Sequence, residues 1–170
     1  TESFNLDECL ATVKNLKRGR VLHVVGDGPM LDYLKSVNRK NRNVVFYGKR
    51  DLKDIIAISK KCRYGLLPYE HQSGRFRYHK TNKFAEYLCL GLQPVVHREL
   101  EEMSNFCEKN SIGFIYKNYE ELGKWWDNEK DEEGQESVQV RVKNLSNKYF
   151  SEETFNKNIM KAIRNCLETT

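Results

Sequence analysis

Residues 78–96 read YHKTNKFAEYLCLGLQPVV, and this stretch decides how the rest of the chain is interpreted. A charged beginning leads into apolar residues at helical spacing. A glycine follows, and the apolar run PVV at 94–96 then predicts a strand. Lysines stand where the helix begins, although acidic residues are usually preferred at that end. We therefore expect the beginning of this helix to face an anion.

The chain on both sides of this stretch alternates between strand and helix. Short apolar runs predict strands that are buried on both faces. These runs lie at 21–25, 43–48, 64–69, 94–96 and 112–116. Helical spacing fills the intervals, and Asp51 is a suitable N-cap for one of the helices. Such alternation with short joints predicts an α/β fold, a Rossmann-like open parallel sheet with helices on both faces.

The two ends of the chain are also predicted to be helical. Residues 6–16 have helical spacing, 127–137 predict a polar loop, and the remainder predicts closing helices. The pattern VQVRV at 138–142 fits a strand as well. Trp125 and Trp126 are expected to close the core under these last helices. Because residue 1 is Thr and the opening is already helix-like, we expect a fragment of a longer protein.

Composition limits the classes of function. The 170 residues suit a single domain, and no stretch reaches the ~18 apolar residues that a membrane-spanning helix needs. Five cysteines without a CxxC spacing indicate buried free thiols in a reducing cytosol, not a metal site.

The net charge is +9 over residues 1–100 and −4 over residues 101–170. A phosphate ligand or an anionic membrane suits the basic half. Nucleic acid is not an expected partner, because no recognition motif is present.

Two strand ends carry glycines or basic residues, and open parallel sheets bind ligands beyond the carboxyl ends of their strands. After the first strand, VVGDGP contains Gly26 and Gly28, which allow a backbone to approach a ligand closely. An ordinary tight turn explains these glycines equally well. After the second strand, Lys49 and Arg50 follow FYG. They could edge a bound base or lie in a solvated loop.

The third strand end opens into a long basic loop at 70–83, about 14 residues where two to six are usual. Free N–H groups at the start of the following helix would hold a phosphate-type anion. A basic lid without a ligand is the alternative. Glu86 lies one turn into that helix, where its carboxylate could accept two hydrogen bonds from a ribose diol or pair with Lys83. The basic residues of the loop are Arg75, Arg77, Lys80 and Lys83.

Four segments, in this order and spacing, resemble the carboxyl-terminal, donor-nucleotide domain of GT-B glycosyltransferases of the family 4 or group 1 type. They are VVGDGPMLDYL, NVVFYGKR, YGLLPYE and NKFAEYLCLGLQPVV, all within residues 21–96. The resemblance implies that this single domain, residues 1–170, holds a nucleotide-diphosphate sugar. It also implies roles for individual residues but assigns no catalytic residue to this chain.

By that resemblance, Glu86 binds the ribose hydroxyls, and Thr81, Asn82 and Lys83 meet the diphosphate. Lys49 and Arg50 edge the base, and Gly26 and Gly28 form the turn beside the donor. Lys80 adds positive charge from the basic loop. Tyr78 stands where the family has the first of its two glutamates, so the paired-glutamate signature is incomplete. The donor-binding residues implied are Gly26, Gly28, Lys49, Arg50, Tyr78, Lys80, Thr81, Asn82, Lys83 and Glu86.

The activity implied is that of a hexosyltransferase that serves polysaccharide biosynthesis and transfers sugar to a glycan or lipid-linked hydroxyl. The nucleotide sugar is the substrate, and we expect the transfer to require neither a cofactor nor a metal ion. Its partner is an amino-terminal acceptor domain, in cis or as a separate subunit, so this fragment alone is expected to be inactive. We expect a cytoplasmic protein, with peripheral contact at the inner face of a membrane through the basic runs. A non-catalytic interaction module with the same fold is the competing hypothesis.

The resemblance also implies that the first, central strand of the family fold precedes this chain. Without it, strands 21–25 and 64–69 must pair directly, or a segment from elsewhere, such as a partner chain, must lie between them.

Overall fold

The computed structural model describes residues 20–68, 81–128, 135–151 and 153. Within them the chain alternates between strands and helices, as the sequence predicts. The strands are β1 (Leu22–Val25), β2 (Val44–Gly48), β3 (Tyr64–Leu67), β4 (Gln93–His97) and β5 (Phe114–Tyr116). The helices are α2 (Leu31–Val37), α3 (Leu52–Ser59), α4 (Asn82–Cys89), α5 (Glu101–Asn110), α6 (Tyr119–Asn128) and α7 (Gln135–Phe150). The helix expected at 6–16 lies outside the described residues.

The local signals in the sequence place most element ends correctly. Asp51 is the N-cap of α3, and its side chain accepts a hydrogen bond of 2.9 Å from the Asp54 amide. The polar loop expected at 127–137 is too long, because α6 continues through Asn128 and α7 begins at Gln135. The Asn128 side-chain amide donates to the Lys124 carbonyl at 2.9 Å and so supports the last turn of α6.

The ambiguous VQVRV segment is helical. Val142 is fully buried and Val138 packs against the same cluster, whereas Val140 between them is exposed. Burial at positions four apart is the helical period, not the alternation of a strand.

Strand β4 is the centre of the core, and all five of its residues are buried. Val95 and Val96 belong to different hydrophobic clusters, because successive strand side chains point to opposite faces. The cluster around Val96 contains Phe84 and Leu88 of α4, Met103 and Phe106 of α5, and Val142 of α7. The cluster around Val95 contains Leu122, Trp125 and Trp126 of α6. Helices therefore cover both faces of this parallel sheet, as predicted.

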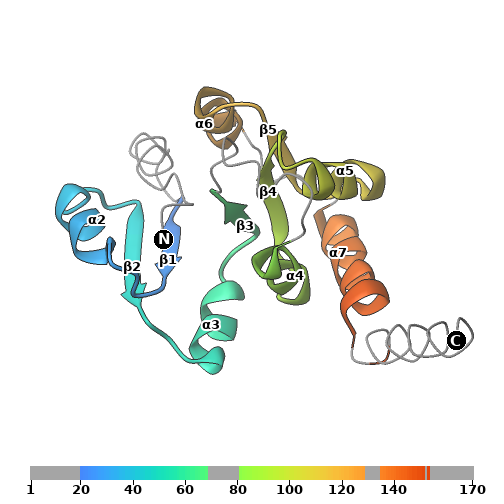
Figure 1. Ribbon diagram of the computed structural model, residues 1–170, viewed down its shortest axis with the longest axis horizontal. Helices are drawn as coiled ribbons and strands as arrows, with labels where there is room; N and C mark the ends of the chain where they lie inside the picture. Colours follow the sequence, from blue (N-terminus) through green and yellow to red (C-terminus); the bar gives the residue numbers. More distant parts are fainter. Residues whose placement is uncertain (1–19, 69–80, 129–134, 152, 154–170) are drawn as a thin grey trace, which may run out of the picture.

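The strands form two parallel sheets instead of one. The first has the order β1-β2 and the second β3-β4-β5. Figure 1 shows β1 and β3 as the strands of each sheet that lie nearest the other. No hydrogen bond joins β1 to β3 in the part of the chain that the structure describes. Direct pairing of 21–25 with 64–69 is therefore wrong, and insertion of another strand stays a prediction. We call this interruption the sheet break.

The hydrogen bonds show which backbone groups border the sheet break. The Gln93 amide donates to the carbonyl of Arg63, just before β3, at 2.9 Å. The backbone N–H and C=O groups of every second residue from there, Gly65 and Leu67, therefore also point toward β4. The Leu66 carbonyl consequently lies on the opposite edge, toward the sheet break. The Leu22 amide donates to the Asn43 carbonyl at 2.7 Å, which leaves the backbone of His23 on the edge of β1 away from β2.

Apolar packing does cross the sheet break. Trp126 packs against both the cluster of α2 with β1–β2, which includes Leu34 and Val44, and the cluster of α6 with β3–β5. Both tryptophans belong to α6 and pack from it against the cluster around Val95. The closing helix expected after residue 150 lies mostly outside the described residues, so its packing against them stays a prediction. Among the described residues, no helix is long and apolar enough to cross a membrane.

The cysteines differ in burial. Cys107 is buried, Cys62 is half-buried and Cys89 is exposed, so the expectation of buried thiols is wrong for Cys89. Cys89 is at the end of α4, where the Ser146 hydroxyl of α7 approaches its sulfur at 3.4 Å. Cys9 and Cys166 lie outside the described residues.

Gly65 is predicted to tolerate no side chain. A Cβ atom there would lie 2.3 Å from the ring of Tyr87, whereas one at Gly28 would meet nothing within 4 Å. Gly65→Ala is expected to lower the free energy of unfolding by about 1–3 kcal/mol, the usual range for overpacking. Gly28→Ala is the matched control and should change stability little. Urea unfolding followed by circular dichroism measures both. Equal stability of the two variants would contradict this packing.

Cys107 is predicted to be unreactive in the folded protein. Burial, and secondarily the charge of Glu108, raises the pKa of its thiol to about 12. At pH 8 the thiol therefore stays protonated as well as inaccessible. A brief treatment with iodoacetamide should label Cys89 and leave Cys107 unlabelled until urea is added, as read by peptide mass mapping. Labelling of Cys107 at the rate of Cys89 under native conditions would contradict the prediction.

Candidate functional site

The start of α4 is fixed by Thr81 and by two core anchors. Thr81 has extended backbone angles, and its Oγ1 accepts a hydrogen bond of 3.3 Å from the Phe84 amide. The Thr81 carbonyl accepts from the same amide at 3.0 Å. Phe84 and Leu88 are fully buried on the side of α4 that faces the core. Thr81 is thus an N-cap, as the fold requires at the entry to a helix.

The first two amides of α4 have no acceptor among the described residues. Thr81 satisfies Phe84 and Ala85, and no hydrogen bond of the described residues involves the amides of Asn82 and Lys83. The first turn contains no acidic residue. Unpaired amides and the positive end of the helix dipole together favour a bound anion. The helix predicted here is present, and the expectation that its start faces an anion stays a prediction.

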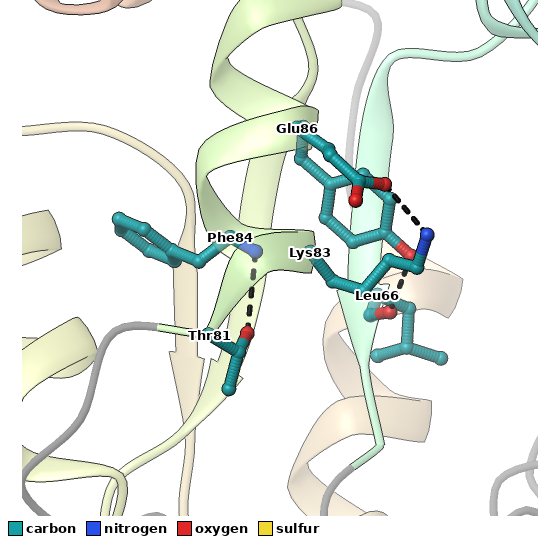
Figure 2. A network of polar contacts seen from close by, with 6 residues as sticks. Leu66, Thr81, Lys83, Phe84 and Glu86 are labelled. Carbon is teal, nitrogen blue, oxygen red and sulfur yellow. Dashed lines mark hydrogen bonds and ion pairs between the residues drawn. The ribbon is translucent and has the colours of Figure 1, made fainter. Parts of the chain in front are cut away.

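Glu86 is engaged by Lys83. The Lys83 Nζ lies 2.6 Å from the Glu86 Oε2, and the two side chains are 54% and 50% exposed. Figure 2 shows both side chains on the side of α4 that faces Leu66 of β3. The ion pair, one of the two alternatives left open by the sequence, is the arrangement in this structure. Glu86 is accessible to solvent at the same time.

Tyr87 connects this site to the end of β3 and was not anticipated from the sequence. Its hydroxyl donates to the Leu66 carbonyl at 3.1 Å, and its ring lies over Gly65. The Leu66 carbonyl is one of those that border the sheet break, so the hydroxyl satisfies an edge group. The signal was a lone glycine within a predicted strand, which often marks close approach by another group.

The turn after β1 is tied to the end of β2. The Gly26 amide donates to the Gly48 carbonyl at 2.9 Å, and the Gly28 carbonyl accepts from the Leu31 amide at 2.9 Å. Gly26 and Gly48 have φ values of 139° and 69°, which side chains other than glycine rarely adopt. The backbone geometry therefore requires glycine at 26 and 48, whereas Gly28 has no positive φ and has space for a side chain. For Gly26 the tight-turn alternative is sufficient.

Lys49 and Arg50 lie next to this turn. Both are exposed, and the Arg50 Nε lies 3.8 Å from Asp54 Oδ2 across the first turn of α3. The Arg50 Nη1 also donates to the Lys49 carbonyl at 3.0 Å. Because neither cation is buried, both can turn toward a ligand.

The predicted site residues thus form two groups. Gly26, Gly28, Lys49 and Arg50 lie at the ends of β1 and β2, whereas Thr81, Asn82, Lys83 and Glu86 lie at the start of α4. The sheet break separates the two groups. Tyr78 and Lys80 lie outside the described residues. Among the residues described, no cluster of three or more His, Cys, Asp or Glu side chains could hold a metal ion.

Buried His97 closes the carboxyl end of β4. Its Nε2 lies 2.6 Å from the Lys117 carbonyl, and its Nδ1 accepts from the Glu99 amide at 3.2 Å. These two bonds require the neutral tautomer with the proton on Nε2. His97 therefore joins the chain after β4 to the chain after β5 and has no nitrogen left for a ligand.

A family model and a solved structure match this chain. The model described as "Glucosyltransferase 3-like, C-terminal domain" matches residues 6–163. The apo form of the lipopolysaccharide outer core galactosyltransferase WaaB superposes with a TM-score of 0.68 at 12% identity. That alignment covers 96% of this chain and 45% of the other, so this chain spans less than half of that protein. The low identity limits the likeness to the fold. No curated protein is significantly similar in sequence.

Thr81 is predicted to contribute to stability through its hydroxyl. Thr81→Ala should lower the free energy of unfolding by about 0.5–1 kcal/mol, the lower part of the range for N-caps. The low value is expected because the Phe84 amide keeps its bond to the Thr81 carbonyl. Urea unfolding checks the value, and Thr81→Ser, which retains the hydroxyl, is the control. A loss as large in Thr81→Ser as in Thr81→Ala would show that the hydroxyl is not the stabilising group.

Proposed function

Because the chain belongs to the family of glucosyltransferase 3-like C-terminal domains, we propose that it is the donor-binding half of a glycosyltransferase. The donor is a nucleotide-diphosphate sugar, and the acceptor is a hydroxyl of a glycan or of a lipid-linked molecule. The family description names a glucosyltransferase, which supports transfer of a hexosyl group.

The unpaired amides at the start of α4 carry the proposal. They lie in the segment that follows β3, on the side of the sheet where parallel α/β proteins bind ligands. Asn82 and Lys83 supply N–H donors to the diphosphate, and the Lys83 ammonium supplies charge. Glu86, one turn further, supplies two carboxylate oxygens for the ribose diol. Lys49 and Arg50 edge the base, and Lys80 and Tyr78 belong to the same donor site.

The chemistry of transfer explains why an anion site is central. The bond between the anomeric carbon and the diphosphate oxygen breaks, and its electron pair leaves with the diphosphate. The acceptor oxygen bonds to the same carbon and loses its proton to a base outside the described residues. Amides and cations aimed at the leaving group stabilise the charge that develops there. That stabilisation is the catalytic contribution of this half.

The remaining functions belong to other parts of the protein. We propose an acceptor-binding domain, in cis or as a separate subunit, without which this chain transfers no sugar. Such an enzyme works in the cytoplasm and contacts the inner face of the membrane peripherally. One surface that supports such contact is on α2, where Met30, Tyr33 and Val37 are exposed next to Arg39 and Lys40.

The Lys83–Glu86 ion pair favours a second candidate function, a non-catalytic interaction module. A glutamate that only pairs with its neighbour on the helix surface needs no ligand. Substitution of Glu86 separates the two functions, since only the enzyme depends on its carboxylate for the donor.

The donor site predicts binding of a nucleoside diphosphate by the full-length protein. Glu86→Ala should weaken uridine diphosphate roughly ten- to hundred-fold, because a hydrogen bond to a charged group contributes about 1.5–3 kcal/mol. Isothermal titration calorimetry gives the affinities. Glu120→Ala is the matched control, because Glu120 also pairs with a lysine on its own helix at 2.6 Å.

Two outcomes would count against the enzyme. Absence of binding for uridine, guanosine and adenosine diphosphates would eliminate the donor site. Unchanged sugar transfer by Glu86→Ala in the full-length protein would support the interaction module.

A further inference from the structure

Lys83 and Glu86 satisfy each other in this structure, although a bound donor would use them separately. In the proposed donor site, the Lys83 ammonium would pair with the diphosphate and the Glu86 carboxylate with the ribose. Here their distance is 2.6 Å, with Nζ on the side of α4 that faces Leu66 (Figure 2). We propose that Glu86 is an internal competitor that holds Lys83 until a ligand with both a diphosphate and a ribose replaces the pair. This inference rests on the proposed donor site.

The position of Lys83 explains why it needs a counter-charge. A cation in the first turn is repelled by the positive end of the helix dipole. The first turn of α4 contains no acid, and Glu86 in the next turn offsets that repulsion. A bound diphosphate would offset it better, because its charge is larger and because it would also accept from the unpaired amides of Asn82 and Lys83. Ligand and glutamate therefore compete for the same ammonium.

Exposure makes the exchange reversible. Both side chains are about half exposed, so neither has to be dehydrated before the pair opens. An exposed pair of this kind contributes little, equivalent to a factor of roughly two to five in an equilibrium. The pair can therefore attenuate the affinity for an anion without abolishing it. Thr81, Phe84 and Leu88 keep the helix in place while the two side chains move.

The competition acts as a specificity filter. An anion without a ribose, such as pyrophosphate, has to take Lys83 from Glu86 and leaves the carboxylate without a partner. A nucleoside diphosphate also pairs with Lys83, but its two ribose hydroxyls then donate hydrogen bonds to the Glu86 carboxylate. The same carboxylate thus opposes inorganic phosphates and favours nucleotides.

The test compares pyrophosphate with uridine diphosphate on three variants of the full-length protein by isothermal titration calorimetry. Glu86→Gln should bind pyrophosphate roughly two- to five-fold more tightly, because Lys83 is released. The same variant should bind uridine diphosphate at least ten-fold more weakly, because the ribose loses a charged acceptor. Lys83→Gln should weaken both ligands. Glu120→Gln, which opens the matched pair with Lys124 on α6, should change neither.

The outcomes separate the filter from the donor site. If Glu86→Gln leaves pyrophosphate affinity unchanged or lowers it while the parent protein binds uridine diphosphate, the filter is wrong and the donor site stands. If the parent protein binds none of the three nucleoside diphosphates, both fail. Thermal unfolding of each variant establishes that the helix is intact, since a general loss of folding would weaken both ligands together.

Discussion

Burial of β4 on both faces is the constraint on which the rest of the described structure depends. A strand with no exposed residue needs a helix layer on each side, and Val95 and Val96 each belong to one of these layers. Pro94 within this strand lacks an N–H group. The backbone groups of residue 94 point toward β5, because those of Gln93 point toward β3. Pairing with β5 begins only at Val95, so the missing N–H of Pro94 removes no hydrogen bond between the strands. Gly113 packs directly against Pro94 and has no side chain to obstruct this contact. A Cβ atom at position 113 would lie only 2.1 Å from the Pro94 carbonyl oxygen.

The same constraint positions the candidate site. Packing of Phe84 and Leu88 against the buried strand fixes α4, and the Tyr87 hydroxyl ties it to the end of β3. The start of the helix is then held at the carboxyl side of the sheet, with Thr81 as its cap. Two amides and the Lys83–Glu86 pair are left at the surface of a helix whose position the core fixes. Such a surface suits recognition of an anion, because little has to be ordered when the ligand binds.

The sequence predicted the features that depend on short-range patterns. The positions of strands and helices followed from the spacing of apolar residues, from the N-cap Asp51 and from the glycines at the strand ends. Their alternation along the chain then predicted a parallel sheet. Features set by distant partners could not be predicted in this way. Whether β1 pairs with β3 depends on hydrogen bonds between remote segments, and the choice of Glu86 between Lys83 and a ligand involves small energies on both sides. Tyr87 was missed because its partner, Gly65, is 22 positions away in the sequence.

The sheet break and the candidate site are parts of one geometric problem. Neighbouring strands lie about 4.8 Å apart, so direct pairing would place the ends of β1 and β3 at that spacing, whereas one intervening strand would place them about 10 Å apart. Lys49 and Arg50 lie on the β1–β2 side, and Lys83 and Glu86 on the other. In the proposed donor site, a nucleotide would contact both groups and would therefore have to span this interval. The width of the sheet break then sets the distance that such a ligand must cover between Lys49 and Lys83.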